Sequence, residues 1–220
     1  MILNDTYINI YMRLFIITLI IAISDAWDNS FLLPNIPIDR WTHVRNNVLR
    51  EQGKNKSFLD IGCGLGFSTS KTPGSLGIDS SRENIEKAKI MFPEKDFRLG
   101  VVSSWRDDLI YDISTCMFYL HDIPSYKRKK VIETAIYNAK ERVIIVDVCP
   151  DFVPDREIAI KKPYFNDYLL NCRYELRYFK ESVLVENHIH KWVLELNTED
   201  EQKKIYEENL KQILRYYRPV

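Results

Sequence analysis

The feature that most constrains the fold is an apolar run, residues 57–61, that contains Asp60 near its end and leads directly into a glycine-rich turn. Three glycines, Gly62, Gly64 and Gly66, alternate with other residues in this turn. Glycines here let the backbone approach a ligand closely and adopt conformations that are closed to other residues. The pattern predicts a buried strand whose carboxyl end meets a small molecule.

A second strand pattern, residues 75–79, ends in Asp79, whose carboxylate is placed to accept hydrogen bonds from a ribose diol. Because the carboxyl ends of strands in a doubly wound sheet meet at one edge, both strand ends are expected to converge on one nucleoside. A helix after the glycine turn would also present free backbone N–H groups, which favour a carboxylate or a phosphate.

The spacing of the glycines separates two classes of cofactor. A dinucleotide-binding turn reads G-x-G-x-x-G, whereas this turn reads G-x-G-x-G with Asp60 two positions before the first glycine. A carboxylate so close would repel a pyrophosphate, but it would suit a cofactor with an ammonium group and a sulfonium. A nucleotide-dependent oxidoreductase stays open as a less favoured alternative.

Strand and helix patterns alternate along the chain up to Pro150. This order predicts an α/β fold with a doubly wound parallel sheet, since parallel strands need right-handed crossover connections. Residues 178–196 then read as two strands with a turn near Asn187 and His188. Earlier in the chain, Ser80 and Glu83 form a possible capping box at the start of a helix. The expected strands before this pair are 57–61, 75–79, 97–102, 111–118 and 142–148, and the expected helices are 39–52, 80–92, 125–140 and 161–174.

The charge balance argues against a nucleic-acid partner. The 220 residues include 31 Lys and Arg and 31 Asp and Glu, which gives a formal net charge of zero. Proteins that hold nucleic acid by its phosphates normally carry a basic surplus. The composition therefore favours a small-molecule partner.

Several segments resemble the motifs of class I S-adenosylmethionine-dependent methyltransferases. Residues 60–66 resemble the first motif of that family, and residues 77–81 resemble its ribose-binding motif. Residues 111–124 are similar to the fourth-strand segment of the small-molecule "type 11" branch, where a Leu-His pair is common, and residues 143–147 to the fifth strand. The resemblance implies a Rossmann-like, doubly wound, mostly parallel seven-stranded sheet that closes with an antiparallel C-terminal hairpin.

The resemblance also implies a cofactor and an activity. The cofactor would be S-adenosyl-L-methionine, and its methyl group would pass to an O, N or C atom of a small-molecule acceptor. Because the cofactor is already activated, the protein would mainly align nucleophile and methyl group. Asp79 would take the ribose hydroxyls, and the backbone of residues 117–119 would pass beside the methionine group. The expected cofactor-binding residues are Asp60, Gly62, Cys63, Gly64, Asp79, Ser80, Trp105, Met117 and Phe118.

Two segments depart from the family pattern. The segment 67–74 is short for a full helix and includes Pro73, so the first helix would have only a turn or two. The segment after the third strand lacks the acid that often meets the adenine amine; Asp107 or Asp108 could serve instead, and Trp105 could stack on adenine. These departures leave a non-catalytic nucleoside-binding or scaffold protein with the same fold as the alternative.

His121 is the candidate catalytic residue, because it follows a strand at the carboxyl edge of the sheet. It would act as a general base or as a polar wall of the acceptor pocket, and the alternative is a loop histidine bonded to backbone. His188 and His190 share a face of an extended segment, but a metal site needs three or four ligands and no third is visible. No metal is therefore expected.

Four cysteines, Cys63, Cys116, Cys149 and Cys172, match no metal or redox spacing. Three of them lie in or beside apolar runs, which indicates small buried side chains. A disulfide between Cys149 and Cys172 stays open for a chain that enters an oxidising compartment.

The N-terminus resembles a targeting segment. Arg13 precedes an apolar run, residues 14–23, and Ser24 and Ala26 then provide a small-x-small cleavage site. We expect entry into the endomembrane system with cleavage after Ala26, or membrane association if the segment is retained; a buried first helix would leave the protein cytoplasmic. The expected divisions are 1–26 for this segment, 27–197 for the methyltransferase domain and 198–220 for a C-terminal helix.

Overall fold

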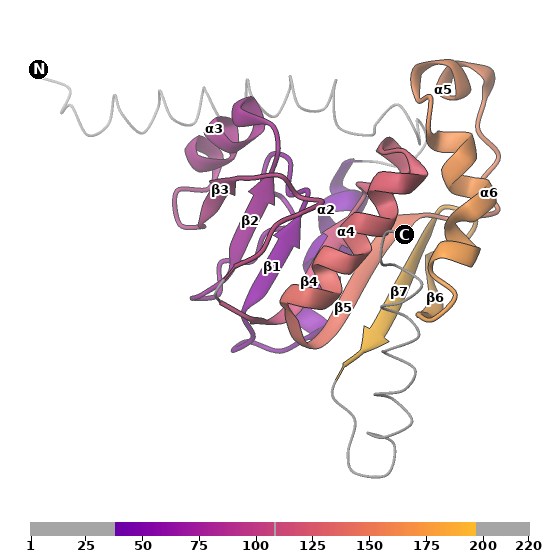
Figure 1. Ribbon diagram of the computed structural model, residues 1–220. Coiled ribbons are helices and arrows are strands. Elements are labelled where there is room, and N and C mark those ends of the chain that lie inside the picture. The colour runs from indigo at the N-terminus through magenta and orange to yellow at the C-terminus, as the bar shows by residue number, and fades with distance from the viewer. Residues whose placement is uncertain (1–37, 108, 197–220) are drawn as a thin grey trace, which may run out of the picture.

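The computed structural model describes residues 38–107 and 109–196 (Figure 1). The expected targeting segment and C-terminal helix lie outside the described residues, so both stay predictions. Within the described ranges, every helix is too short or too polar to cross a bilayer.

A single seven-stranded sheet forms the centre of the described chain, in the order β3-β2-β1-β4-β5-β7-β6. The first five strands run parallel, whereas β7 is antiparallel to both β5 and β6. This arrangement confirms the predicted doubly wound fold with its C-terminal hairpin. The strands are β1 (Phe58–Ile61), β2 (Leu76–Asp79), β3 (Phe97–Leu99), β4 (Tyr111–Met117), β5 (Ala139–Val148), β6 (Lys180–Val185) and β7 (Ile189–Glu195).

Helices α2 and α4 lie on opposite faces of the sheet (Figure 1). Together with the other helices they cover the apolar strands, because a parallel sheet must be buried on both faces. The helices are α2 (Ile38–Glu51), α3 (Arg82–Met91), η1 (Leu120–Asp122, a 3₁₀ turn), α4 (Ser125–Asn138), α5 (Arg156–Lys161) and α6 (Phe165–Glu175).

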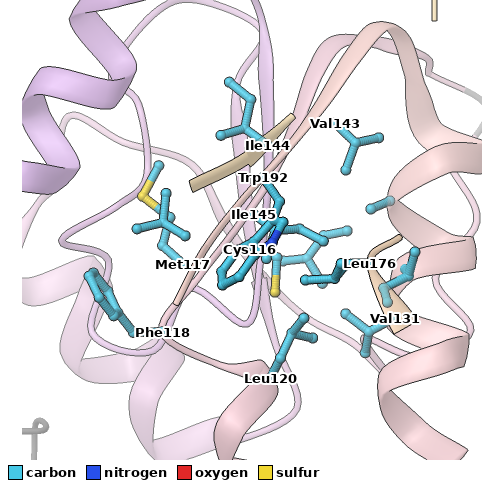
Figure 2. Close-up of a cluster of buried hydrophobic side chains, with 14 of the residues drawn as sticks. Cys116, Met117, Phe118, Leu120, Val131, Val143, Ile144, Ile145, Leu176 and Trp192 are labelled. Atoms are coloured by element: carbon cyan, nitrogen blue, oxygen red, sulfur yellow. The ribbon is translucent and has the colours of Figure 1, made fainter. Parts of the chain in front are cut away.

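The hydrophobic core is built around β4 and β5. Figure 2 shows side chains from both strands, among them Cys116 and Ile145, beside Trp192 of β7 and Val131 of α4. Trp192 is 1% exposed, and residues 143–146 of β5 have no exposed surface. This packing fixes the central strands, and their carboxyl ends are therefore rigid supports for the loops that follow them.

One buried arginine joins α4 to α6. The guanidinium of Arg128 donates through Nε to Glu175 Oε2 at 2.7 Å and through Nη2 to Asp167 Oδ2 at 2.6 Å. Its Nη1 donates to the carbonyl of Ile123 at 2.8 Å. Since a buried charge is tolerated only when it is paired and hydrogen-bonded, these contacts explain why an arginine can occupy a fully buried position on α4.

Three element boundaries differ from the sequence-based expectation. The cap of α3 is Ser81 rather than Ser80, because the Ser81 hydroxyl accepts the backbone N–H of Asn84. The helix expected over 161–174 begins only at Phe165, as α6, because proline at position 163 disfavours a helical conformation at the residue before it, and the short helix α5 that precedes it was not expected. The strand expected at 97–102 ends at Leu99.

The connection between β1 and β2 contains turns but no helix. The glycine turn is therefore followed by neither a full first helix nor the shortened one expected from the sequence. The free N–H groups of a helix N-terminus, which we expected to hold an anion, are absent from this connection.

All four cysteines are buried and free, in agreement with the prediction that they are small buried side chains. Cys149 and Cys172 are both buried free thiols. Burial raises the pKa of both thiols, which keeps them protonated and unreactive.

Candidate functional site

A cavity of about 300 Å³ opens at the carboxyl ends of β1, β2 and β4. Its position is that of ligand sites in doubly wound sheets, and its volume is at the lower end of the range for small-molecule pockets. It is lined by Arg45, Gly62, Cys63, Gly64, Leu65, Phe67, Ser68, Asp79, Asn84, Met117, Phe118, Tyr119 and Asp122.

The glycine turn forms one side of this cavity. Gly62, Gly64 and Gly66 have φ values of 72°, 53° and 86°, all in the left-handed region that favours glycine. The N–H groups of Gly62 and Cys63 both donate to the carbonyl of Ile78, at 2.9 Å and 3.0 Å, so the turn is fixed to the end of β2. Gly62, Cys63 and Gly64 all line the cavity, and their contact with a cofactor stays a prediction.

Asp60 lies beneath the turn rather than in the cavity lining. Its carboxylate is fully buried and accepts hydroxyl hydrogen bonds from Ser68 at 2.8 Å, Thr69 at 2.6 Å and Thr115 at 3.2 Å. Burial raises the pKa of Asp60, although the three hydroxyls oppose the shift. The acid therefore ties Ser68 and Thr69, which follow the glycine turn, to the adjacent strands β1 and β4.

Asp79 lies directly beside the glycine turn, at the end of β2. Its Oδ2 accepts the backbone N–H of Gly64 at 2.9 Å, and its Oδ1 accepts that of Ser81 at 2.7 Å. The carboxylate lines the cavity although Asp79 is only 6% exposed. Each oxygen has a further lone pair, so Asp79 can accept two more hydrogen bonds from a ligand diol.

The end of β4 supplies the opposite wall. Phe118 has a φ of 57°, which is strained for a bulky residue. Its ring lies 4.2 Å from that of Trp41, edge to face, and the Arg45 guanidinium lies 4.8 Å from its centre. Both Met117 and Phe118 line the cavity, and their contact with a cofactor stays a prediction.

Ser80 and Trp105, the other expected cofactor ligands, do not line the cavity. Ser80 is exposed beside it. Trp105 packs on Gly100, where an added Cβ would lie 2.4 Å from Cζ3 of the indole. Asp107 accepts the Tyr111 hydroxyl at 2.9 Å, and Asp108 lies outside the described residues. The described residues between β3 and β4 therefore contribute nothing to the cavity lining. Adenine contacts of Trp105 stay a prediction.

His121 is fully buried and also lies outside the cavity lining. Its Nδ1 lies 2.6 Å from Oδ1 of Asp147, and its Nε2 lies 3.5 Å from Oδ2 of Asp122. Burial disfavours the charged imidazole, but the carboxylates of Asp147 and Asp122 outweigh it and raise the pKa of His121. Asp122 lines the cavity and pairs with Lys162 at 2.6 Å. His121 thus contacts one residue of the cavity lining, Asp122.

Seven lining residues are not among the predicted site residues, although the backbone of residues 117–119 was expected beside the methionine group: Arg45, Leu65, Phe67, Ser68, Asn84, Tyr119 and Asp122. Tyr119 and Asp122 stand beside predicted positions at the end of β4, so their place in the chain was a usable signal. Arg45 carried no such signal, because it lies on α2 and reaches the cavity only through the packing of that helix.

No family model matches the chain. Solved structures with the same fold include an S-adenosylmethionine-dependent methyltransferase from Clostridium acetobutylicum, at 15% identity and a TM-score of 0.54, covering 80% of this chain and 99% of that one. A DhpI complex with SAH matches at 17% identity and a TM-score of 0.55, covering 80% and 93%. The plantazolicin methyltransferase BpumL, in complex with a pentazolic desmethylPZN analogue and SAH, matches at 18% identity and a TM-score of 0.51, covering 80% and 90%.

These likenesses, together with the strand order, define the class of fold. The chain has the Rossmann-like fold of class I S-adenosylmethionine-dependent methyltransferases.

Proposed function

We propose that this chain binds S-adenosylmethionine in the cavity and transfers its methyl group to an O, N or C atom of a small-molecule acceptor. The observation that carries the proposal is the position of Asp79, whose carboxylate holds the Gly64 N–H at 2.9 Å while it lines the cavity. A carboxylate so placed accepts a ribose diol at the point where a glycine turn leaves room for the rest of the nucleoside.

Arg45 is the proposed partner of the cofactor's carboxylate. No helix N-terminus follows the glycine turn, so that source of positive potential is missing. Among the described residues that line the cavity, Arg45 is the only lysine or arginine. Its guanidinium is held over the Phe118 ring, with only 6% of the residue exposed. A guanidinium in such a position can bind a carboxylate with two hydrogen bonds.

The bound cofactor would supply an activated methyl group, and the chain's own residues would position it. Asp79 and the glycine turn orient the nucleoside, while Phe118 and Tyr119 exclude water from the wall at the end of β4. Asp122 lines the same cavity, so its carboxylate is available to orient an acceptor hydroxyl or amine. Alignment of the two reactants is the main contribution that such a site makes to the rate.

A specific observation supports a second candidate, a nucleoside-binding protein without catalytic activity. The described residues between β3 and β4, where adenine contacts were expected, do not line the cavity. A cofactor held only at its ribose and amino-acid ends would bind weakly. A protein with such a weak site could have kept the fold as a scaffold without catalytic activity.

Thermal unfolding with S-adenosylmethionine, S-adenosylhomocysteine and a nicotinamide dinucleotide tests the proposal. Either adenosyl ligand, at 100 times its dissociation constant, should stabilise the protein by about 2.7 kcal/mol, and the dinucleotide should have no effect. Stabilisation by the dinucleotide alone would contradict the proposal. Binding without turnover on a panel of small-molecule hydroxyl, amine and activated-carbon acceptors would favour the scaffold.

A further inference from the structure

Asn84, on the first turn of α3, lines the cavity with a side chain that is available to a ligand. Its carboxamide forms no hydrogen bond with the part of the chain that the structure describes. The hydroxyl of Ser68, another lining residue, is in contrast engaged, because it donates to Asp60 at 2.8 Å. A free carboxamide offers a ligand both a hydrogen-bond acceptor and a hydrogen-bond donor.

The packing of α3 fixes the position of Asn84. Its backbone N–H donates to the Ser81 hydroxyl at 3.2 Å, which caps the start of the helix. Ile85 and Ala88 are only 5% and 0% exposed, so the inner face of the helix is buried. An added Cβ on Gly66 would lie 3.3 Å from that of Ala88, so α3 also packs against the glycine turn. Asn84 therefore stands on a rigid support, which a binding side chain needs for precise placement.

The strand order places Asn84 on one particular side of the cavity. The strands run in the order β3-β2-β1-β4, and α3 packs against β2 and β3 (Figure 1). Met117 and Phe118, at the end of β4, lie on the other side of β1. A nucleoside with its ribose at Asp79 and its 5′ substituent over the glycine turn directs its base away from β4. The base then lies on the β2 and β3 side, which is the side of Asn84.

We infer that Asn84 binds the edge of the adenine ring and thereby selects an adenosyl cofactor. The inference rests on the proposed function, which assigns the ribose to Asp79. Adenine carries an amino donor beside a ring-nitrogen acceptor, and the carboxamide of asparagine is the complementary partner for this pair. The Asn84 oxygen accepts from the 6-amino group, and its amide nitrogen donates to the ring nitrogen.

This contact supplies what the segment after β3 lacks. The N–H of Gly100 donates to the Asp79 carbonyl at 2.9 Å, so the end of β3 adjoins the ribose-binding acid. The described residues between β3 and β4 nevertheless do not line the cavity. Asn84 provides the base contact from α3 instead.

Calorimetric titration of the full chain with two ligands tests the inference. One is S-adenosylhomocysteine, and the other is its 6-desamino analogue, in which purine replaces adenine. The wild type should bind S-adenosylhomocysteine about fivefold more tightly, which corresponds to one neutral hydrogen bond. In Asn84→Ala this preference should fall below about twofold. The matched control is Glu86→Ala, which removes an exposed acid of α3 that does not line the cavity and should keep both affinities.

Asn84→Asp provides an independent arm that keeps the size of the side chain. An acid suits the first turn of a helix, so α3 should stay folded in this variant. The carboxylate can accept from the amino group but has no donor for the ring nitrogen. This variant should bind S-adenosylhomocysteine more weakly than the wild type, yet keep a preference over the analogue at least as large as that of the wild type.

Three results would overturn the inference. Equal affinities of the wild type for the two ligands would show that the site does not recognise the amino group. A fivefold preference that persists in Asn84→Ala would assign that group to another residue, and loss of the preference in Asn84→Asp would reduce Asn84 to a packing contact. If the folded wild type bound neither ligand, the proposed function itself would fail, and the inference with it.

Discussion

The Nδ1 atom of His121 lies 2.6 Å from Oδ1 of Asp147, and neither side chain has any exposed surface. Asp147 also accepts the backbone N–H of Leu120 at 2.9 Å through its other oxygen. The pair joins η1 to the end of β5, and it places the other imidazole nitrogen towards Asp122. We therefore expect His121 to act as a positioning residue for Asp122.

This pair should make stability depend on pH. The raised pKa of His121 means that its stabilising contribution is complete below its unfolded value of about 6.5 and is lost as the pH rises through the folded value. We compare the wild type with His121→Gln/Asp147→Asn, in which neither side chain titrates. As the pH rises above about 6.5, the wild type should lose unfolding free energy relative to the double variant. A difference in urea unfolding that is constant or grows with pH would contradict this role.

The two glycines of the turn should respond differently to substitution. An added Cβ at Gly64 meets nothing within 4 Å, whereas one at Gly62 would collide with Tyr119. Gly64→Ala should therefore cost only the strain of its positive φ, about 1 kcal/mol, while its methyl group obstructs the cavity and abolishes cofactor binding. Gly62→Ala should lower the melting temperature further. Calorimetry and thermal unfolding measure both effects; normal binding by Gly64→Ala would show that the first motif is misassigned.

Asp60 should matter for stability rather than for direct cofactor contact. Asp60→Ala leaves three buried hydroxyl groups without their acceptor and should cost about 3 kcal/mol of unfolding free energy. The raised pKa of Asp60 implies that its contribution is present at low pH and is lost as the pH rises through the folded value. The wild type should accordingly gain stability relative to Asp60→Asn as the pH falls towards 4. The opposite trend in urea unfolding would mean that the buried carboxylate is stabilised as an anion.

The succession of strands along the chain was predictable because most strands carry a local signal of their own. Residues 142–148 are almost entirely apolar and β-branched, and Asp79 stands at a strand end where the topology alone places it at the sheet edge. The doubly wound sheet and its C-terminal hairpin followed from these patterns and from the resemblance of the motifs.

The missed features all depend on tertiary packing. The helix expected after the glycine turn does not form, because Asp60 binds the hydroxyls of Ser68 and Thr69 and holds that segment in turns. Arg45 enters the cavity from α2, and no periodicity in α2 shows which strand end it will face. Position alone could not distinguish the buried His121 from its exposed neighbour in the cavity, Asp122.

The central claim is that Asp79 binds the ribose of an adenosyl cofactor in this cavity, and isothermal titration with S-adenosylhomocysteine tests it most directly. The wild type should bind one equivalent. Asp79→Ala should bind at least about a hundredfold more weakly, because each lost hydrogen bond to a charged group costs about 1.5 to 3 kcal/mol. The control is Asp151→Ala, which removes an exposed acid that pairs with Arg173 and does not line the cavity. This variant should bind like the wild type. Equal affinity of Asp79→Ala and the wild type, or no binding by the wild type, would contradict the claim.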